Sequence, residues 1–314
     1  MSFLYFLEGL RNPVCDALFS IITFLGEETV FIVLGLIFFW CIDKNKGYYL
    51  LCTGFIGTVI NQFLKMLCRI PRPWVRDPNF TIVESAREGA SGYSFPSGHT
   101  QLSVGLFGGI AVCNKKLWVR IASVALCVLV PLSRMYLGVH TPADVLVSLC
   151  IAGVLIFGLY PLFKKAENSP KLMYTILGSM ALLMVLFLIY VCCFSFPKVV
   201  YLEENRHNLI SARENGFTML GCLLGLIVVY TVDIKFTKFK TDAVWWAQII
   251  KTVCGLALVL LAKEGLKAPL NALFGGHVSA RAVRYFAVVI VAGVLWPLTF
   301  KFFSKLGKTK IQND

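Results

Sequence analysis

Charged residues are scarce in this sequence, and long polar segments are missing from it. Asp, Glu, Lys and Arg make up 15% of the 314 residues, hydrophobic residues make up 57%, and the mean hydropathy is +0.74. A soluble domain of this length could not bury so much apolar surface, so we predict an integral membrane protein. No soluble domain or low-complexity stretch interrupts the apolar runs, which predicts one continuous membrane-embedded unit.

Metal-binding patterns are also missing. The 11 cysteines stand mostly inside apolar runs and none forms a Cys-x-x-Cys pair, so we interpret them as small packing residues. Only four histidines are present, and we interpret two of them, His207 and His277, as surface residues. The sequence therefore predicts no metal site and no cofactor.

Acidic residues are outnumbered by basic ones, 17 to 30, which gives a formal net charge of +13. In a soluble protein this excess could indicate binding to nucleic acid. Here most basic residues flank apolar runs, where membrane topology and anionic lipids account for them, so we expect no nucleic-acid partner. The first six residues, Met-Ser-Phe-Leu-Tyr-Phe, have neither a basic region nor a small-residue cleavage site, and we expect no signal peptide.

The apolar runs predict an all-α polytopic membrane protein, a helical bundle of about nine transmembrane spans. We expect these spans at residues 29–42, 47–67, 96–112, 117–137, 140–163, 171–194, 216–232, 245–263 and 282–303. Residues 13–25 have a helical pattern but are too short to cross a bilayer, so we predict a short interfacial helix that ends near Gly26. We assign residues 1–165 to a core and residues 166–314 to additional C-terminal helices packed on that core.

Three short polar islands lie within the core, each at the end of an apolar run. They are Lys65 with Arg72-Pro73, then Pro96-Ser97-Gly98-His99, and then Ser133-Arg134 with His140 and Asp144. Together they supply three cations, two imidazoles, a carboxylate and a Ser-Gly turn that opens a helix. This inventory suits phosphoryl transfer, in which charge on the transferring oxygens must be neutralised. Residues 69–95 form a polar, proline-containing loop between the first two islands, and we expect it to be a lid over the site.

The third island suggests a nucleophile. His140 and Asp144 are four residues apart at the start of a predicted helix, so we expect their side chains to share one helix face. The carboxylate can accept one imidazole N–H, leave the other nitrogen unprotonated toward a phosphorus atom, and stabilise the cation formed on attack. The arrangement follows the logic of a Ser-His-Asp triad, with histidine as nucleophile instead of base.

The remaining island residues suit phosphate binding. Lys65, Arg72 and Arg134 would neutralise the phosphoryl oxygens, and each arginine can offer a two-pronged contact. Backbone N–H groups near Ser97 and Gly98, at a helix N-terminus, would add donors and a favourable dipole.

The three islands match the signature motifs of the type 2 phosphatidic acid phosphatase superfamily, which this sequence resembles over roughly residues 13 to 160. The pattern is Lys-six residues-Arg-Pro, then Pro-Ser-Gly-His, then Ser-Arg-five residues-His-three residues-Asp, and every position is filled at the right spacing. The resemblance implies that His140 becomes a phosphohistidine and that Asp144 orients it. It also implies that His99 protonates the leaving group and later activates water, without a metal ion.

The resemblance predicts a metal-independent membrane phosphatase that acts on a lipid phosphate or pyrophosphate. An outward-facing site and a compact chain look like the bacterial phosphatases of undecaprenyl pyrophosphate or phosphatidylglycerophosphate. The nine expected spans and the outward N-terminus are also similar to glucose-6-phosphatase and the sphingosine-1-phosphate phosphatases, so a soluble sugar phosphate stays open as substrate.

A phosphotransferase with a lipid or sugar acceptor would use the same residues, and a catalytically silent transporter is a third class. Vanadate haloperoxidases share the motifs but are soluble, and the composition argues against them.

Basic residues in short loops predict how the protein is oriented in the membrane. The pairs Lys44 and Lys46, Lys115 and Lys116, and Lys164 and Lys165 fall on one side of the expected spans, which should be cytoplasmic. The three motifs then face outward. The tail, residues 308–314, carries no retrieval signal, so we favour a bacterial plasma membrane over an endoplasmic reticulum with a lumenal site.

Two further basic patches open expected spans on the motif side of the membrane. One contains Arg213, and the other contains Arg281 and Arg284. We expect these three arginines to contact the substrate head group, with capping of helices and contact with lipid phosphates as the alternative.

Overall fold

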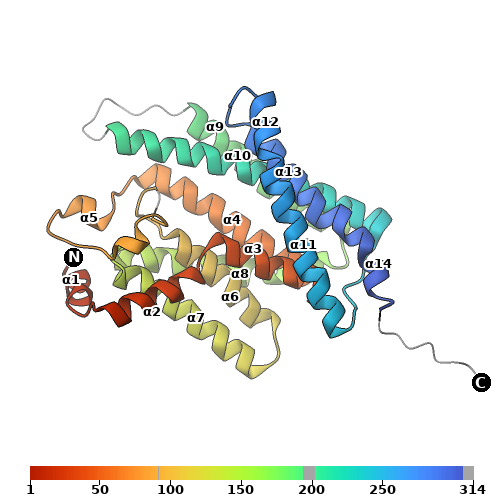
Figure 1. Cartoon of the computed structure of the whole chain (residues 1–314), viewed down its shortest axis with the longest axis horizontal. Helices are drawn as coiled ribbons and strands as arrows, with labels where there is room; N and C mark the ends of the chain where they lie inside the picture. Colours follow the sequence, from red (N-terminus) through yellow and green to blue (C-terminus); the bar gives the residue numbers. More distant parts are fainter. Residues whose placement is uncertain (91, 194–201, 307–314) are drawn as a thin grey trace, which may run out of the picture.

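The computed structural model describes residues 1–90, 92–193 and 202–306, and every regular element in these ranges is a helix (Figure 1). The expected all-α polytopic membrane fold is therefore confirmed. The tail at residues 308–314 and the end of the expected span at residues 171–194 lie outside the described residues.

The core consists of four helices, one of which, α6 (Gly98–Cys113), is surrounded by the other three. These helices are α4 (Lys44–Cys68), α6 (Gly98–Cys113), α7 (Leu117–Tyr136) and α8 (Pro142–Ala166). Helix α6 contacts the other three, and most of its residues are buried. Glycines allow the close approach, because a Cβ at Gly109 would lie 2.6 Å from Leu50 Cδ2 of α4, and one at Gly108 would lie 2.6 Å from Ile156 Cδ1 of α8.

The motifs meet at one end of this core, where α4 and α7 finish and α6 and α8 start. Helix α4 is terminated by Arg69, which adopts a left-handed conformation with φ of 50° and turns the chain toward the proline-rich loop. At the same end, the Ser97 N–H donates to the Asp144 carbonyl over 3.1 Å, and the Ser148 hydroxyl donates to the Ser97 carbonyl over 2.9 Å. These bonds fix the first turns of α6 and α8 relative to each other.

The N-terminal helices run along the outside of the core, from the motif end toward the other end (Figure 1). They are α1 (Ser2–Glu8), α2 (Pro13–Phe24), α3 (Glu28–Ile37) and the π-helical η1 (Phe38–Ile42). Helix α2 packs on α7, and α3 packs on α4 and α6. Gly26 lies at the elbow between α2 and α3, where a Cβ would come within 2.8 Å of Val130 Cγ1 and 3.3 Å of His99 Cβ. The elbow therefore passes directly beside the second motif.

The loop between α4 and α6 is packed against the protein along most of its length. It contains the short helices α5 (Pro73–Arg76) and η2 (Glu84–Ala86). Phe80 and Ile82 are buried against Leu4, and the segment of Ala86 and Ala90 is buried against the end of α7. The segment expected as a lid thus forms a packed cover over the motif end of the core.

The C-terminal helices form a second group that crosses the core (Figure 1). They are α9 (Pro170–Cys193), α10 (Leu202–Val232), η3 (Asp233–Thr237), α11 (Trp245–Gly265), α12 (Lys267–Leu273), α13 (Ala280–Ile290), η4 (Val291–Leu295), η5 (Trp296–Thr299) and α14 (Phe300–Phe303). Helices α10 and α13 cross closely at Gly221, where a Cβ would collide with the Ala282 carbonyl. Buried Lys251 of α11 donates to the Trp40 carbonyl over 2.9 Å, which ties this group to η1.

Among the described residues, fewer helices are long enough to cross a membrane than the nine that the sequence predicts. Among the described residues, seven helices are long and apolar enough to cross a membrane, and eight if α2 and α3–η1, bent by 47°, form one span. The other expected spans, at residues 29–42 and 96–112, are helical but short. Helix α6 has only 16 residues because its N-terminus starts at the motif, inside the protein. The interfacial helix expected at residues 13–25 is α2, the first half of the bent pair.

Candidate active site

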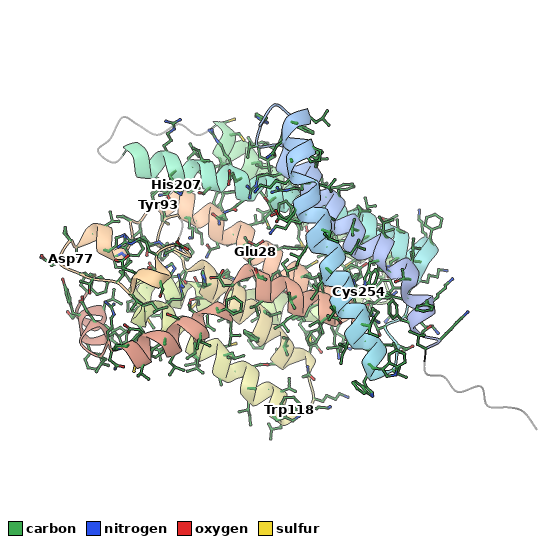
Figure 2. The ribbon with its side chains drawn as sticks, viewed as in Figure 1. Glu28, Asp77, Tyr93, Trp118, His207 and Cys254 are labelled. Carbon is green, nitrogen blue, oxygen red and sulfur yellow. The ribbon has the colours of Figure 1, made fainter. Side chains whose placement is uncertain are left out.

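A cavity of about 300 Å³ opens at the motif end of the core. Its walls come from α4, α6, the elbow between α2 and α3, the loop before α6, and α10. Tyr93 and Glu28, which line the cavity, are labelled in Figure 2. Five of the predicted site residues line it: Lys65, Arg72, Gly98, His99 and His140.

Lys65 and Arg72 supply positive charge to the cavity. Lys65 lies in the last turn of α4, is mostly buried, and makes no hydrogen bond to the described residues through its ammonium group. Arg72 is buried after the turn that ends α4, and it donates to the Gly92 carbonyl over 3.0 Å and to the Val139 carbonyl over 2.9 Å. Two backbone carbonyls therefore hold the guanidinium in place beside the cavity.

Arg72 also indicates which ring nitrogen of His140 carries the proton. Its Nη1 lies 2.9 Å from His140 Nε2. A guanidinium can only donate hydrogen bonds, so Nε2 must accept and the ring proton resides on Nδ1. His140 Nδ1 in turn lies 3.4 Å from Asp144 Oδ2. The imidazole is thus neutral, with its lone pair at the cavity wall and its N–H toward a carboxylate.

Asp144 is held by the start of α8. Its Oδ2 accepts hydrogen bonds from the Thr141 N–H over 2.7 Å and from the Ser94 hydroxyl over 2.5 Å. Thr141 is the N-cap of α8 and forms a capping box with Asp144. His140 lies before the N-cap, so the two residues meet without sharing a helix face, which corrects the sequence expectation. Ser94 was not predicted, since nothing in the sequence marks a serine in the loop as a partner of this carboxylate.

The environment of His140, which lies between α7 and α8, keeps its ring unprotonated. Burial lowers the pKa of His140 well below its ordinary value, and the charges of Arg72, Arg134 and Lys65 lower it further. A low dielectric and three nearby cations both disfavour a charged imidazolium.

His99 occupies the first turn of α6 with a partner that the sequence did not reveal. Ser97 caps this helix and accepts from the Thr100 N–H over 3.4 Å, as expected for its position. His99 Nε2 lies 3.0 Å from Glu27 Oε1, which belongs to the elbow between α2 and α3. The feature of the sequence that could have indicated this partner is Gly26-Glu27-Glu28, where acidic residues follow a predicted helix on the motif side.

Three of the site residues predicted from the motifs do not line the cavity: Ser97, Arg134 and Asp144. Arg134 is buried, and its Nη1 donates to the Thr23 hydroxyl over 2.8 Å. Its Nε and Nη2 have no hydrogen-bond partner among the described residues. Its charge acts on both His99 and His140.

The arginines expected to contact a head group do not line the cavity either. Arg213 donates to the Val191 carbonyl over 2.9 Å, near the end of α9. Arg281 contacts Thr218 and Glu214, and Arg284 is stacked near the Tyr285 ring. Their role in binding a head group stays a prediction. The two remaining histidines, His207 and His277, are exposed as expected.

No group of three or more His, Cys, Asp or Glu side chains within the described parts of the chain is arranged to hold a metal ion. The two histidines that line the cavity instead each pair with one carboxylate, His99 with Glu27 and His140 with Asp144.

Curated relatives of this chain are phosphatases of phosphorylated lipids by name. A probable sphingosine-1-phosphate phosphatase of Dictyostelium discoideum is 29% identical over 159 residues, which is 46% of this chain and 38% of that protein. The undecaprenyl-diphosphatase BcrC of Bacillus subtilis is 28% identical over 149 residues, 47% of this chain and 74% of that protein. Sphingosine-1-phosphate phosphatase 2 of Mus musculus is 25% identical over 203 residues, 63% of this chain and 55% of that protein. No solved structure matches the chain significantly.

Two family models match separate parts of the chain. The PAP2 superfamily model matches residues 46–168, which contain all three motifs. The model of the transmembrane extension of PAP2 superfamily phosphatases matches residues 217–309, which begin within α10. The chain is therefore an integral membrane protein that belongs to the PAP2 superfamily, the type 2 phosphatidic acid phosphatases, and carries the transmembrane extension of its phosphatases.

Proposed function

We propose that this chain hydrolyses a lipid phosphate or pyrophosphate through a phosphohistidine formed on His140. The observation that carries the proposal is the setting of His140, with Nε2 accepting from Arg72 over 2.9 Å at the cavity wall and Nδ1 3.4 Å from Asp144. A neutral imidazole with a carboxylate behind it is the arrangement that nucleophilic attack by histidine requires. The names of the relatives, phosphatases of sphingosine 1-phosphate and undecaprenyl diphosphate, support a phosphorylated lipid as substrate.

In the first step, His140 Nε2 attacks the phosphorus atom. The N–P bond forms while the bond from phosphorus to the leaving oxygen breaks. The Arg72 N–H that donates to Nε2 in this structure turns to a phosphoryl oxygen, and the Lys65 ammonium neutralises a second one. Asp144 stabilises the positive charge that develops on the imidazole ring.

His99 supplies the proton that the leaving oxygen needs. Burial and the charge of Arg134 lower the pKa of His99 to about 4, and the hydrogen bond to Glu27 Oε1 opposes this shift and orients the ring. In the second step, the neutral His99 accepts a proton from water while the water oxygen attacks phosphorus. The N–P bond then breaks, which releases phosphate and restores neutral His140.

We propose that the reaction proceeds without a metal ion, because side chains provide the charge that it needs. Lys65, Arg72 and Arg134 contribute three cations, and two nitrogens of Arg134 have no partner among the described residues. These nitrogens can turn toward a phosphoryl oxygen once an anion enters. The N-terminus of α6 at Gly98 adds backbone N–H donors.

The site faces the outer side of the membrane in this proposal. Helices α4, α6, α7 and α8 all meet the motifs at one end, so the turns that contain Lys46, Lys115 and Lys164 lie at the other end. Short basic turns are retained on the cytoplasmic side, so the cavity opens outward.

The test is phosphate release by purified protein in detergent with excess chelator. The panel contains undecaprenyl pyrophosphate, phosphatidylglycerophosphate, phosphatidic acid, sphingosine 1-phosphate and glucose 6-phosphate, and His140→Ala is the control. We expect release from at least one lipid, loss of release in the variant, and an acid-labile phosphoenzyme in the wild-type protein only. Release that requires added metal, or that persists in His140→Ala, would contradict the mechanism. Transfer of phosphate to an added lipid or sugar acceptor, without release to water, would identify a phosphotransferase instead.

A further inference from the structure

The inner part of the cavity is lined by buried amide side chains that the proposed chemistry does not use. Asn61, Gln101 and Asn208 are 2%, 2% and 5% exposed, and all three line the cavity. Asn61 Nδ2, Asn208 Nδ2 and both amide atoms of Gln101 have no hydrogen-bond partner among the described residues. A buried polar group without a partner is destabilising, so three such side chains on one cavity indicate a surface built to bind a polar ligand.

The amides begin next to the phosphate-binding turn and continue inward. Asn61 is one turn before Lys65 on α4, so the two side chains share a face about 6 Å apart along the helix axis. A Cβ at Gly98 would lie 3.8 Å from Asn61 Oδ1, and one at Gly57 would lie 2.7 Å from Gln101 Nε2. Asn61 therefore borders the second motif, and Gln101 lies a further turn of α4 away from Lys65.

Helix α10 supplies the opposite part of this surface. Asn208, Ser211 and Asn215 are spaced by three and four residues, which places them on one helix face, and all line the cavity. Met219 extends the same face, and Phe31 and Phe55 line the cavity as well. The walls thus change from polar amides to apolar side chains that can receive hydrocarbon.

The chemistry of this surface excludes a second phosphate as its ligand. Amides are neutral, and the carboxyl group of Glu28 lines the same cavity, whereas a phosphate group needs cations. Each amide offers both a donor and an acceptor, which is also what a hydroxyl group offers. A hydroxyl close to the phosphate ester would reach Asn61 while the phosphate stays beside Lys65.

We propose that Asn61, Gln101 and Asn208 form a hydroxyl-binding subsite for the alcohol that carries the phosphate. Building on the proposed function, this makes the substrate a lipid monophosphate with a free hydroxyl group one or two carbons from the phosphate ester. A polyprenyl phosphate or diphosphate, which has no such hydroxyl, leaves the amides unpaired and reacts more slowly. Asn208 lies outside both segments that match the family models.

The experiment compares two substrates that differ by one hydroxyl group, 1-oleoyl lysophosphatidic acid and its 2-deoxy analogue. We expect the wild-type kcat/KM to be ten- to a hundredfold higher for the hydroxyl compound, because a site with buried polar groups rejects an analogue that leaves them unpaired. Asn61→Leu and Asn208→Leu should each reduce this ratio at least fivefold. Asn114→Leu, the same change in the turn after α6 at the opposite end of the core, should keep the wild-type ratio.

The outcomes separate this inference from the proposed function. Equal hydrolysis of both compounds, lost in His140→Ala, would overturn the subsite and leave the phosphatase assignment intact. If neither compound nor any lipid phosphate is hydrolysed, the proposed function fails, and binding to the His140→Ala variant decides the subsite. Calorimetry should then show at least tenfold tighter binding of the hydroxyl compound, and equal binding would overturn the inference. The comparison of substrates on wild-type protein needs no variant to fold.

Discussion

Replacing Asp144 by Asn should remove most of the activity while the fold persists. The carboxylate is 1% exposed and lies 3.4 Å from His140 Nδ1. His140 carries positive charge once it is phosphorylated, and a carboxylate about 4 Å away stabilises that charge by about 4 kcal/mol at an effective dielectric constant of about 20. Since about 1.4 kcal/mol changes a rate tenfold, the Asp144→Asn variant should have a kcat about a thousandfold below that of the wild type.

The same substitution should cost some stability. Asp144 Oδ2 accepts from both the Thr141 N–H and the Ser94 hydroxyl, and a neutral amide oxygen in its place accepts weaker hydrogen bonds than a carboxylate oxygen. We expect the free energy of unfolding to fall by about 1–3 kcal/mol, the cost of an impaired buried hydrogen bond. The activity must therefore be expressed per folded molecule, from phosphate release together with thermal unfolding of the same preparation.

Asp233→Asn is the matched control. Asp233 is 2% exposed and pairs with Lys44 over 2.7 Å, at the end of α10 away from the cavity. Its replacement removes a buried carboxylate and should lower stability without lowering kcat per folded molecule. The reasoning would be refuted if Asp144→Asn kept more than a tenth of the wild-type kcat, or if Asp233→Asn lost as much activity.

Two further predictions concern the histidines. Glu27→Gln should lower kcat about ten- to a hundredfold for an alkyl phosphate but only a few-fold for an aryl phosphate. The reason is that an aryl leaving group needs little proton donation from His99. An equal loss of kcat with both substrates would contradict the role of the Glu27–His99 pair. Because burial and nearby cations lower the pKa of His140, its ring stays neutral as the pH falls through about 6.5. The rate of phosphoenzyme formation, corrected for the titration of the substrate, should therefore not drop near this pH. Rapid-quench measurements between pH 5 and 8 test this point, and an acid limb centred at or above pH 6.5 would count against it.

The motif residues could be singled out from the sequence alone. Lys65, Arg72, His99 and His140 stand at ends of apolar runs, where a polar group is conspicuous, and the structure brings all four to one cavity. The contact between His140 and Asp144 was also predicted, although the stated reason was wrong. The pair is brought together by the capping box at the start of α8, and not by a shared helix face.

The residues that the sequence missed depend on tertiary contacts. Glu27 reaches His99 only because the elbow between α2 and α3 folds over the start of α6, and Ser94 reaches Asp144 only because the loop is packed down. Asn61 and Gln101 lie inside apolar runs, where single amides do not disturb the hydropathy that predicts a span. The nine expected spans likewise overlooked that a helix such as α6, enclosed by protein, need not reach across the bilayer.

Catalysis and recognition of the alcohol come from different parts of the chain. The groups to which we assign chemistry come from residues 27–144, whereas part of the amide surface comes from Asn208 on α10. The transferred phosphoryl group is the same for every substrate, and only the alcohol differs, so selectivity must reside in the walls that contact the alcohol. A wall on α10 can change without removing the contacts of His140 to Arg72 and Asp144, because neither of these residues belongs to α10. Substitutions along the Asn208–Asn215 face should therefore alter which alcohol is accepted, while the rate of hydrolysis of the phosphohistidine, which no longer holds the alcohol, should stay the same.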